Sequence, residues 1–484
     1  MQKCGFDRMR YRLALSAGLI SAVTLLLSGC MVGPNYHKPS APVAPAFQEP
    51  APPAPVSPNG ISYSDWWKVF NDPMLDNLET QADAANRDIK ISIARVDETS
   101  ASTSIARSFL FPTVGAAPSV SRFREAQNRP NNGNTGGLAK TQNDILLPLF
   151  ASYEIDAWGR IRRSVQSAHA TQEATEADLR FVRLGIEATV AIDYYTLRTI
   201  DQQLKIVDQT LIDFTQALSL TTDRFKKGLN SDLEVAQAKT LLDQTITQKQ
   251  AFQMQRDQLE HAIAVLLGRT VEGFSLPDQP SNPTPPDIPI GLPSDLLERR
   301  PDIAEADRNV AAATAQIGVA KAQYFPQLSL TGFAGYESVN ATSLLNWQNT
   351  IASLGTSAVA PIFTGGRLKA GVQQAQAVYR QSLAQYEKTV LVSYQEVEDQ
   401  LAALHYLEGE SRSEASAVVD ARQAEMIATQ RFRAGLVGYL NVVFAQETEL
   451  ANEQTAAQIA GQRMVASVVL IKALGGGWAG GNTP

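Results

Sequence analysis

Apolar residues recur with a seven-residue period along the proline-free stretch between Pro148 and Pro277. The positions that share this period are Val190, Leu197, Leu204, Leu211, Leu218 and Phe225. Three further apolar residues each follow one of them by three positions, namely Ile200, Val207 and Phe214. This a/d spacing predicts a helix that packs along a seam. A single helix over 160–225 would be about 100 Å long at a rise of about 1.5 Å per residue.

The same pattern occurs twice, so the chain is a tandem duplication. The motif at 158–162 is echoed at 365–369, and the motif at 224–229 is echoed at 431–436, both 207 residues later. Upstream of these motifs the offset is 214, which indicates seven extra residues before the second long helix. Such an insertion belongs in a loop.

Each copy has the same predicted order of a helical stretch, two strands and a long helical hairpin. We expect a first repeat over 63–276 and a second over 294–474, joined by a proline-rich linker over 277–293 and followed by a glycine-rich tail over 475–484. The predicted helical stretches are 75–110 and 301–324. The predicted strands are about 113–124, 145–157, 327–337 and 351–363, and the predicted hairpins are 160–268 and 366–473. The fold class is therefore mainly α with a smaller β portion.

The two hairpins are predicted to turn at glycines. Gly228 and Gly435 occupy the positions of helix C-caps, and Ser231 or Asp232 follows as the N-cap of the returning helix.

The predicted strands have one apolar and one polar face. Leu149, Ala151, Tyr153 and Ile155 alternate with Ser152, Glu154 and Asp156. This alternation suits a membrane barrel with a polar lumen and equally an ordinary half-buried sheet. Four strands are too few to close a barrel, so a barrel would need several chains, and three chains would give twelve strands.

The N-terminus has the organisation of an export signal. Lys3, Arg8, Arg10 and Arg12 precede an apolar core over 13–27, which is too short to span a membrane and is followed by Ser28-Gly29-Cys30. This resembles the bacterial lipobox, so we expect cleavage of residues 1–29 and lipid attachment to Cys30; an ordinary secretory signal is the alternative. In the lipoproteins that this segment resembles, an Asp directly after the lipidated cysteine tends to retain the protein at the inner membrane. This chain has Met31 at that position, which favours the outer membrane. Residues 30–62 are then a lipidated, proline-rich tether.

Composition excludes several classes of protein. With two cysteines, four scattered histidines and a net charge of −7, the chain has no disulfide framework, no spacing of metal ligands and no basic character of a nucleic-acid binder. It has no P-loop, dinucleotide-binding or nucleophile-elbow motif. We expect no enzyme activity, no metal, no nucleic-acid partner and no cofactor beyond the covalent lipid on Cys30.

Several motifs resemble those of one family. They lie at 30–36, 66–75, 291–303, 324–326 and 361–367, with the run Gly291-Leu292-Pro293-Ser294-Asp295-Leu296-Leu297-Glu298-Arg299-Arg300-Pro301-Asp302-Ile303 the most specific. The chain resembles the TolC family of outer-membrane efflux channels, and most of all its OprM-type lipoproteins. The resemblance covers nearly the whole mature chain.

The resemblance implies a lipid-anchored homotrimer with a twelve-stranded β-barrel in the outer membrane and an α-barrel in the periplasm. It implies docking to a periplasmic adaptor and an inner-membrane pump, for which this chain is a passive, gated exit duct for small molecules such as drugs. A channel for peptide or protein secretion and a periplasm-spanning tether without a pore are the alternatives. A tether has no use for the strands.

The resemblance also places the gate at the hairpin tips. The matching residues are Asp232, Glu234, Arg431, Phe432, Tyr439, Asn441 and Phe444. Asn441 and Phe444 replace acidic residues that are common in the family, so a ring of Phe444 side chains would seal by dewetting. Whether charge or apolar side chains seal the channel stays open, and each tip residue has capping or hairpin packing as its alternative role.

Overall fold

The computed structural model describes residues 31–41, 44–49, 65–124, 141–280, 283–288 and 293–476. The chain forms two compact units. The first, here called the sheet unit, comprises Met1–Pro39, Val96–Ala174 and Ala306–Gln385. The second, the hairpin unit, comprises Ser40–Arg95, Thr175–Glu305 and Tyr386–Pro484. Each unit takes segments from both sequence repeats, so neither repeat forms a unit by itself.

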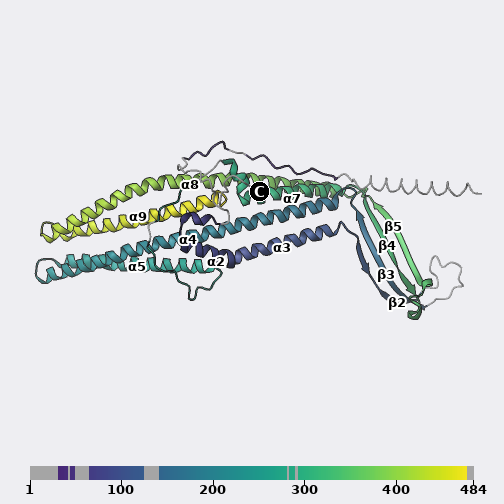
Figure 1. Cartoon of the computed structure of the whole chain (residues 1–484), viewed down its shortest axis with the longest axis horizontal. Coiled ribbons are helices and arrows are strands. Elements are labelled where there is room, and N and C mark those ends of the chain that lie inside the picture. Colours follow the sequence, from purple (N-terminus) through teal and green to yellow (C-terminus); the bar gives the residue numbers. More distant parts are fainter. Residues whose placement is uncertain are drawn as a thin grey trace, which may run out of the picture. The chain divides into compact units, whose positions relative to one another are not determined.

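Two helical hairpins dominate the structure (Figure 1). In the first, α4 (Arg160–Lys226) is followed by α5 (Asp232–Leu266), and in the second α8 (Arg367–Arg433) is followed by α9 (Tyr439–Ala473). The first helix of each pair has 67 residues and the second has 35. Equal lengths in the two copies are what a duplication produces.

The seven-residue seam of α4 is buried along most of its length. Val190, Leu197 and Val207 are 0% exposed, and Phe214 is 2% exposed. The seam ends before the helix does, because Phe225 is 44% exposed.

The stretch predicted as one helix over 75–110 is two helices, α2 (Pro73–Ala85) and α3 (Arg87–Ser108). Asn86 makes the break. Its side-chain Oδ1 accepts hydrogen bonds from the backbone N–H groups of Asp88 (2.8 Å) and Ile89 (3.1 Å), which satisfies the first turn of α3. The other described helices are α7 (Pro301–Ala322), which is as long as α3, and the short helices η1 (Trp66–Phe70), η2 (Pro293–Asp295), α6 (Leu296–Arg299), η3 (Ala341–Ser343) and η4 (Trp347–Asn349).

The main core of the hairpin unit forms where η1 and α2 pack against all four hairpin helices. Trp66 and Leu75 are completely buried there with Leu197, Ile263 and Val468.

Two buried carboxyl groups lie beside this core. Glu79 of α2 is 0% exposed, and within the described part of the chain neither of its oxygens has a hydrogen-bond partner. Glu187 of α4 is 3% exposed and accepts a hydrogen bond from Trp66 Nε1 at 2.8 Å. Burial raises the pKa of Glu79 well above its ordinary value, reinforced by the nearby charges of Glu187, Asp76 and Asp83. Burial also raises the pKa of Glu187 to about 8. Both groups therefore favour the neutral acid.

A buried ionic network joins the first hairpin to the chain that leaves it. Asp201 of α4 accepts hydrogen bonds from Arg198 Nη1 (2.6 Å), from Arg256 Nε of α5 (2.7 Å) and from the backbone N–H of Gln279 (3.2 Å). The guanidinium of Arg256 also pairs with Glu260 at 2.8 Å and with Asp278 at 2.7 Å.

A second set of buried ionic contacts, centred on Arg300, holds the start of the second repeat. Arg300 is 4% exposed and binds Asp302 through two hydrogen bonds of 3.0 and 2.7 Å. It also donates to the backbone oxygen of Ala473 at 2.9 Å and pairs with Glu396 at 2.7 Å, so it joins α7, α8 and α9.

The sheet unit contains an antiparallel sheet whose described strands are β1 (Thr113–Ala116), β2 (Ser119–Arg124), β3 (Thr141–Ile155), β4 (Gln327–Ser338) and β5 (Thr350–Val359). Its order is β1-β3-β4-β5, and β2 also pairs with β3. The predicted strand over 113–124 is interrupted at 117–118. The register runs straight through the gap, from Ala116 opposite Leu149 to Ser119 opposite Leu146. Pro118 has no N–H to donate, so the ladder breaks there without a shift.

Among the described helices, none has a segment both long and apolar enough to cross a bilayer. The described residues also contain no group of histidine, cysteine or acidic side chains that could bind a metal ion.

Candidate functional site

The strand register sorts the sheet into two chemically different faces. Directly paired residues point to the same side, so the pairing of β3 with its neighbours assigns every side chain. The first, here called the apolar face, carries Val114, Val120, Ile145, Leu147, Leu149, Ala151, Tyr153, Ile155, Leu328, Leu330, Ala334, Tyr336, Ala352, Leu354 and Ala358. Its polar members are Arg122, Arg124, Thr141, Asn143, Ser338, Thr350 and Thr356. The second, the polar face, carries Asp144, Ser152, Glu154, Gln327, Ser329, Thr331, Ser353 and Ser357 together with the apolar residues Phe123, Leu146, Phe150, Phe333, Ile351 and Val359.

The apolar face is uncovered in the single chain. Leu149 is 60% exposed, Val120 77% and Leu354 79%. The polar face is linked by hydrogen bonds between strands, for example between the hydroxyl groups of Ser329 and Ser357 at 2.6 Å. An exposed sheet with this distribution needs an apolar environment on one side and water on the other.

Both outer edges of the sheet are open within the described part of the chain. β5 pairs only with β4, and the interrupted strand formed by β1 and β2 pairs only with β3. Open edges of this kind leave backbone groups that need a partner, above all in lipid.

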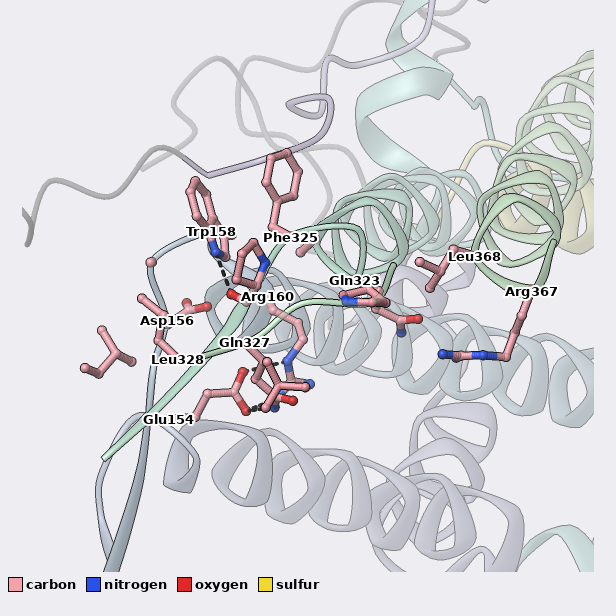
Figure 2. A pocket seen from close by; sticks show the side chains of 16 residues that line it. Glu154, Asp156, Trp158, Arg160, Gln323, Phe325, Gln327, Leu328, Arg367 and Leu368 are labelled. Carbon is pink, nitrogen blue, oxygen red and sulfur yellow. Dashed lines mark hydrogen bonds and ion pairs between the residues drawn. The ribbon is translucent and has the colours of Figure 1, made fainter. Parts of the chain in front are cut away.

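A cavity of about 450 Å³ lies where the sheet meets the helices of the sheet unit (Figure 2). Glu154 accepts two hydrogen bonds from Arg160, at 2.9 and 2.7 Å, and one from Gln327 at 2.7 Å. Asp156 accepts from the backbone N–H groups of Ile161 (3.0 Å) and Arg162 (2.9 Å), so it caps the start of α4. These contacts fix the direction in which α4 leaves the sheet.

Aromatic side chains flank the same junction. Trp158 stacks on Phe325 with ring centroids 4.8 Å apart and donates its Nε1–H to the backbone oxygen of Pro326 at 2.8 Å. At the other end of β4 and β5, Trp347 is 81% exposed. Aromatic residues at both ends of the strands are typical of sheets that span a bilayer.

The residues directly after Cys30 are held at this junction, although Cys30 itself lies outside the described residues. The backbone N–H of Val32 donates to the oxygen of Trp158 at 3.1 Å. Arg163 donates to the oxygens of Val32 and Gly33, each at 3.3 Å. The hydroxyl of Tyr36 donates to Asp307 on α7. A Cβ on Gly33 would lie 2.5 Å from the Cα of Gly318, so this segment and α7 approach too closely for a side chain.

The predicted turn glycines both act as helix C-caps. Gly228 and Gly435 each have a φ of +74°, and a Cβ on either would meet nothing within 4 Å. The N–H of Leu229 donates to the oxygen of Arg224 at 2.8 Å, and the N–H of Leu436 donates to that of Arg431 at 2.9 Å. These are the bonds of a Schellman-type end, so the glycines serve conformation rather than close packing.

Alanine at Gly435 should therefore destabilise the second hairpin by about 1–2 kcal/mol, because a side chain disfavours positive φ. Gly409 is the matched control, since it lies exposed within α8 and has open space around it. Gly409→Ala should stabilise the helix by up to about 1 kcal/mol. Thermal unfolding followed by circular dichroism measures both; equal effects would contradict the assigned role.

The predicted gate residues separate into buried and exposed groups. Phe432 (4% exposed) and Tyr439 (2%) pack with Phe214, Ala238, Leu241, Val442 and Val443 in a small core between the hairpins, here called the tip core. Their rings lie 5.3 Å apart, and the guanidinium of Arg224 lies 4.9 Å above the ring of Phe432. In the single chain Phe432 and Tyr439 therefore contribute to hairpin packing, which is the alternative role that the sequence left open for them.

The other predicted gate residues lie at or near the surface. Asp232, Arg431 and Asn441 are exposed, and Phe444 is 59% exposed. Glu234 is half-buried and accepts a hydrogen bond from the backbone N–H of Ser231 at 2.9 Å, as in a capping box. The structure therefore gives Glu234 a local capping role and leaves Phe444 available for contacts outside the chain.

An acidic cavity next to the tip core was not apparent from the sequence. It measures about 550 Å³, and its carboxylates come from three helices: Asp213, Glu425, Glu449 and Glu453. Burial raises the pKa of both Asp213 and Glu449, and the neighbouring carboxylates raise them further. Arg422 offsets part of this charge through its 2.5 Å contact with Glu453. The carboxylates are 4 to 240 residues apart, so only the helix packing brings them together.

The sequence profile described as "Outer membrane efflux protein" matches residues 78–269 and 292–476. The chain belongs to this family. The match confirms the resemblance to this family that the motifs indicate. It also confirms that the chain is an efflux channel of the outer membrane.

Characterised relatives and a solved structure cover nearly the whole chain of this outer-membrane efflux protein. The toluene efflux pump outer membrane protein TtgC of Pseudomonas putida is 31% identical, over 95% of both chains. The pyoverdine export outer membrane protein OpmQ of Pseudomonas aeruginosa is 32% identical, over 85% of this chain and 87% of OpmQ. The outer-membrane channel OprN superposes with a TM-score of 0.86 at 30% identity, over 93% of this chain and all of OprN.

Proposed function

We propose that this efflux protein is the passive, gated exit duct of a tripartite pump, formed by three copies of the chain. The observation that carries the proposal is the sheet with one apolar face, one polar face and two open edges. The apolar face would contact lipid, the polar face would line a wet lumen, and the edges would pair between copies.

The numbers of strands and residues support a shared barrel. Because β1 and β2 form one interrupted edge strand, each chain supplies the equivalent of four strands, and three chains supply twelve. β3 has 15 residues, which is about 50 Å of strand and about 35 Å of membrane thickness at a tilt of about 45°. That height suffices for a hydrocarbon core of about 30 Å.

The docked N-terminal segment supports lipid attachment at Cys30. Met31 directly follows Cys30, and a Cβ on Gly159 would lie 2.8 Å from the Met31 side chain, so residue 31 sits at the sheet–helix junction. A lipid on Cys30 would enter the bilayer beside the aromatic residues at that end of the sheet. The mature protein would then be lipid-anchored in the outer membrane, with its hairpins in the periplasm.

The relatives support the other partners and the cargo. TtgC is named for a toluene efflux pump and OpmQ for pyoverdine export. We infer that this chain docks to a periplasmic adaptor and an inner-membrane pump through its hairpin tips, and that it exports small molecules. It supplies the route and no catalysis.

The test is the mass and conductance of full-length protein extracted from outer membranes in mild detergent. A protein mass of three chains, followed by ion conductance in planar bilayers, is the expected result. A monomer would leave open strand edges in lipid and would favour a tether without a pore. A trimer that never conducts would overturn the duct while leaving the assembly intact.

Phe444 provides the test of the gate. If three exposed Phe444 side chains seal the resting channel by excluding water, Phe444→Ala should raise the closed-state conductance several-fold. Val419→Ala is the matched control, because Val419 is a comparably exposed apolar residue (64%) on α8. A closed-state conductance that is the same in Phe444→Ala and in the unmodified channel would exclude the apolar seal. Charge at Asp232 and Arg431 would then be the remaining candidate.

A further inference from the structure

Among the described residues that line the cavity at the sheet–helix junction, one cation has no counter-charge in contact with it. Glu154 and Arg160 neutralise each other through their bidentate contact of 2.9 and 2.7 Å. Asp156 is likewise paired, with Arg162 at 3.1 Å. Arg367, the first residue of α8, lines the cavity, and its backbone N–H donates to the oxygen of Thr364 at 3.1 Å. Its guanidinium has no hydrogen bond or ion pair to any other described residue.

Arg367 lies next to the face of the sheet that would line the solute path. Figure 2 shows its side chain extending from α8 toward Gln323 and Gln327. Glu154, Gln327 and Val359, which line the cavity with it, all belong to the polar face of the sheet, and Ile155 and Leu328 of the apolar face also line the cavity. Because the guanidinium is always charged at physiological pH, it acts as a fixed positive charge beside that face.

We propose that Arg367 makes the channel prefer anionic over cationic solutes at the junction between its sheet and its helices. The proposal rests on the proposed function, since the polar face must line the lumen. Three copies would place three such charges at one level of the duct. Fixed charges around a narrow aqueous path raise the local concentration of ions of opposite sign.

The reversal potential of the reconstituted full-length channel in a potassium chloride gradient measures this preference. Arg367→Gln should lower the chloride-to-potassium permeability ratio by roughly two-fold or more. Glu154→Gln should raise the ratio, because it frees the charge of Arg160. Lys369→Gln is the matched control: Lys369 lies two residues further along α8 and is exposed but does not line the cavity, so its removal should leave the ratio unchanged.

Inorganic pyrophosphate is a second probe of the same charge. Added to one side, it should reduce the conductance of the unmodified channel more than that of Arg367→Gln. A conducting Arg367→Gln channel with an unchanged permeability ratio would overturn the inference, as would equal shifts for Arg367→Gln and Lys369→Gln. Absence of conductance in the unmodified protein would instead contradict the proposed duct itself.

Discussion

Asp201→Ala should lower the free energy of unfolding of the hairpin unit by about 3–5 kcal/mol. Asp201 is the carboxylate that two arginines share, and the side chain of Arg198 is 2% exposed and that of Arg256 11%. Alanine would leave the buried guanidinium of Arg198 without its counter-charge, whereas Arg256 would keep its contacts with Glu260 and Asp278. Thermal unfolding of the detergent-solubilised protein, followed by circular dichroism at 222 nm, measures the loss.

Asp208 is the control for this prediction because it is also an ion-paired aspartate on α4. Its contact with Lys249 is as short, at 2.6 Å, but its side chain is 52% exposed. Asp208→Ala should therefore cost less than about 1 kcal/mol. Arg198→Met added to Asp201→Ala should recover part of the loss. A loss for Asp201→Ala as small as that for Asp208→Ala would show that the network contributes little to stability.

The stability of the protein should fall as the pH rises from about 5 to about 8, because of Glu79 and Glu187. Each folded-state pKa lies above the ordinary value of 4.5, and that of Glu187 is about 8. Between 4.5 and the raised pKa the folded chain holds a proton that the unfolded chain has released. Each carboxyl should then reduce the free energy of unfolding by roughly 1.4 kcal/mol per pH unit.

Glu79→Gln separates this effect from other titrations. Glutamine has the shape of the neutral acid and does not ionise, so the variant should match the unmodified protein at pH 5 and unfold at a higher temperature at pH 8.5. Glu98→Gln, at an exposed position on α3, should leave the pH dependence unchanged. A Glu79→Gln protein that is less stable than the unmodified one at every pH would refute the prediction.

The sequence predicted the elements well where local physics determines them. The heptad seam of α4, the glycines that end α4 and α8, and the alternation along β3 are all local patterns. The two differences also had local causes, since Asn86 divides the helix predicted over 75–110 and Pro118 interrupts the first strand. Asn and Pro at those positions are signals that could have been used.

What the sequence left undetermined depends on packing between distant segments. The apolar face extends over all the strands only because the register aligns Leu149 with Ala334 and Ala352, and no local pattern specifies that register. The same holds for the tip core, where Phe432 meets Phe214 across 218 residues of sequence. Glu79 lies on the buried side of α2 with Leu75, Leu78 and Ala82. The sequence of α2 alone gave no reason to expect a buried carboxyl group there.

The way in which the two units are assembled has a consequence for the origin of the chain. Each unit draws on both repeats, so one repeat alone lacks half of every core it contributes to. An unduplicated ancestor could have been stable only as pairs of identical half-length chains. In the proposed trimer, six such chains would take the place of three. Fusion of the halves allowed the two tips to diverge in sequence, so that Ser231-Asp232 in the first repeat corresponds to Gly438-Tyr439 in the second.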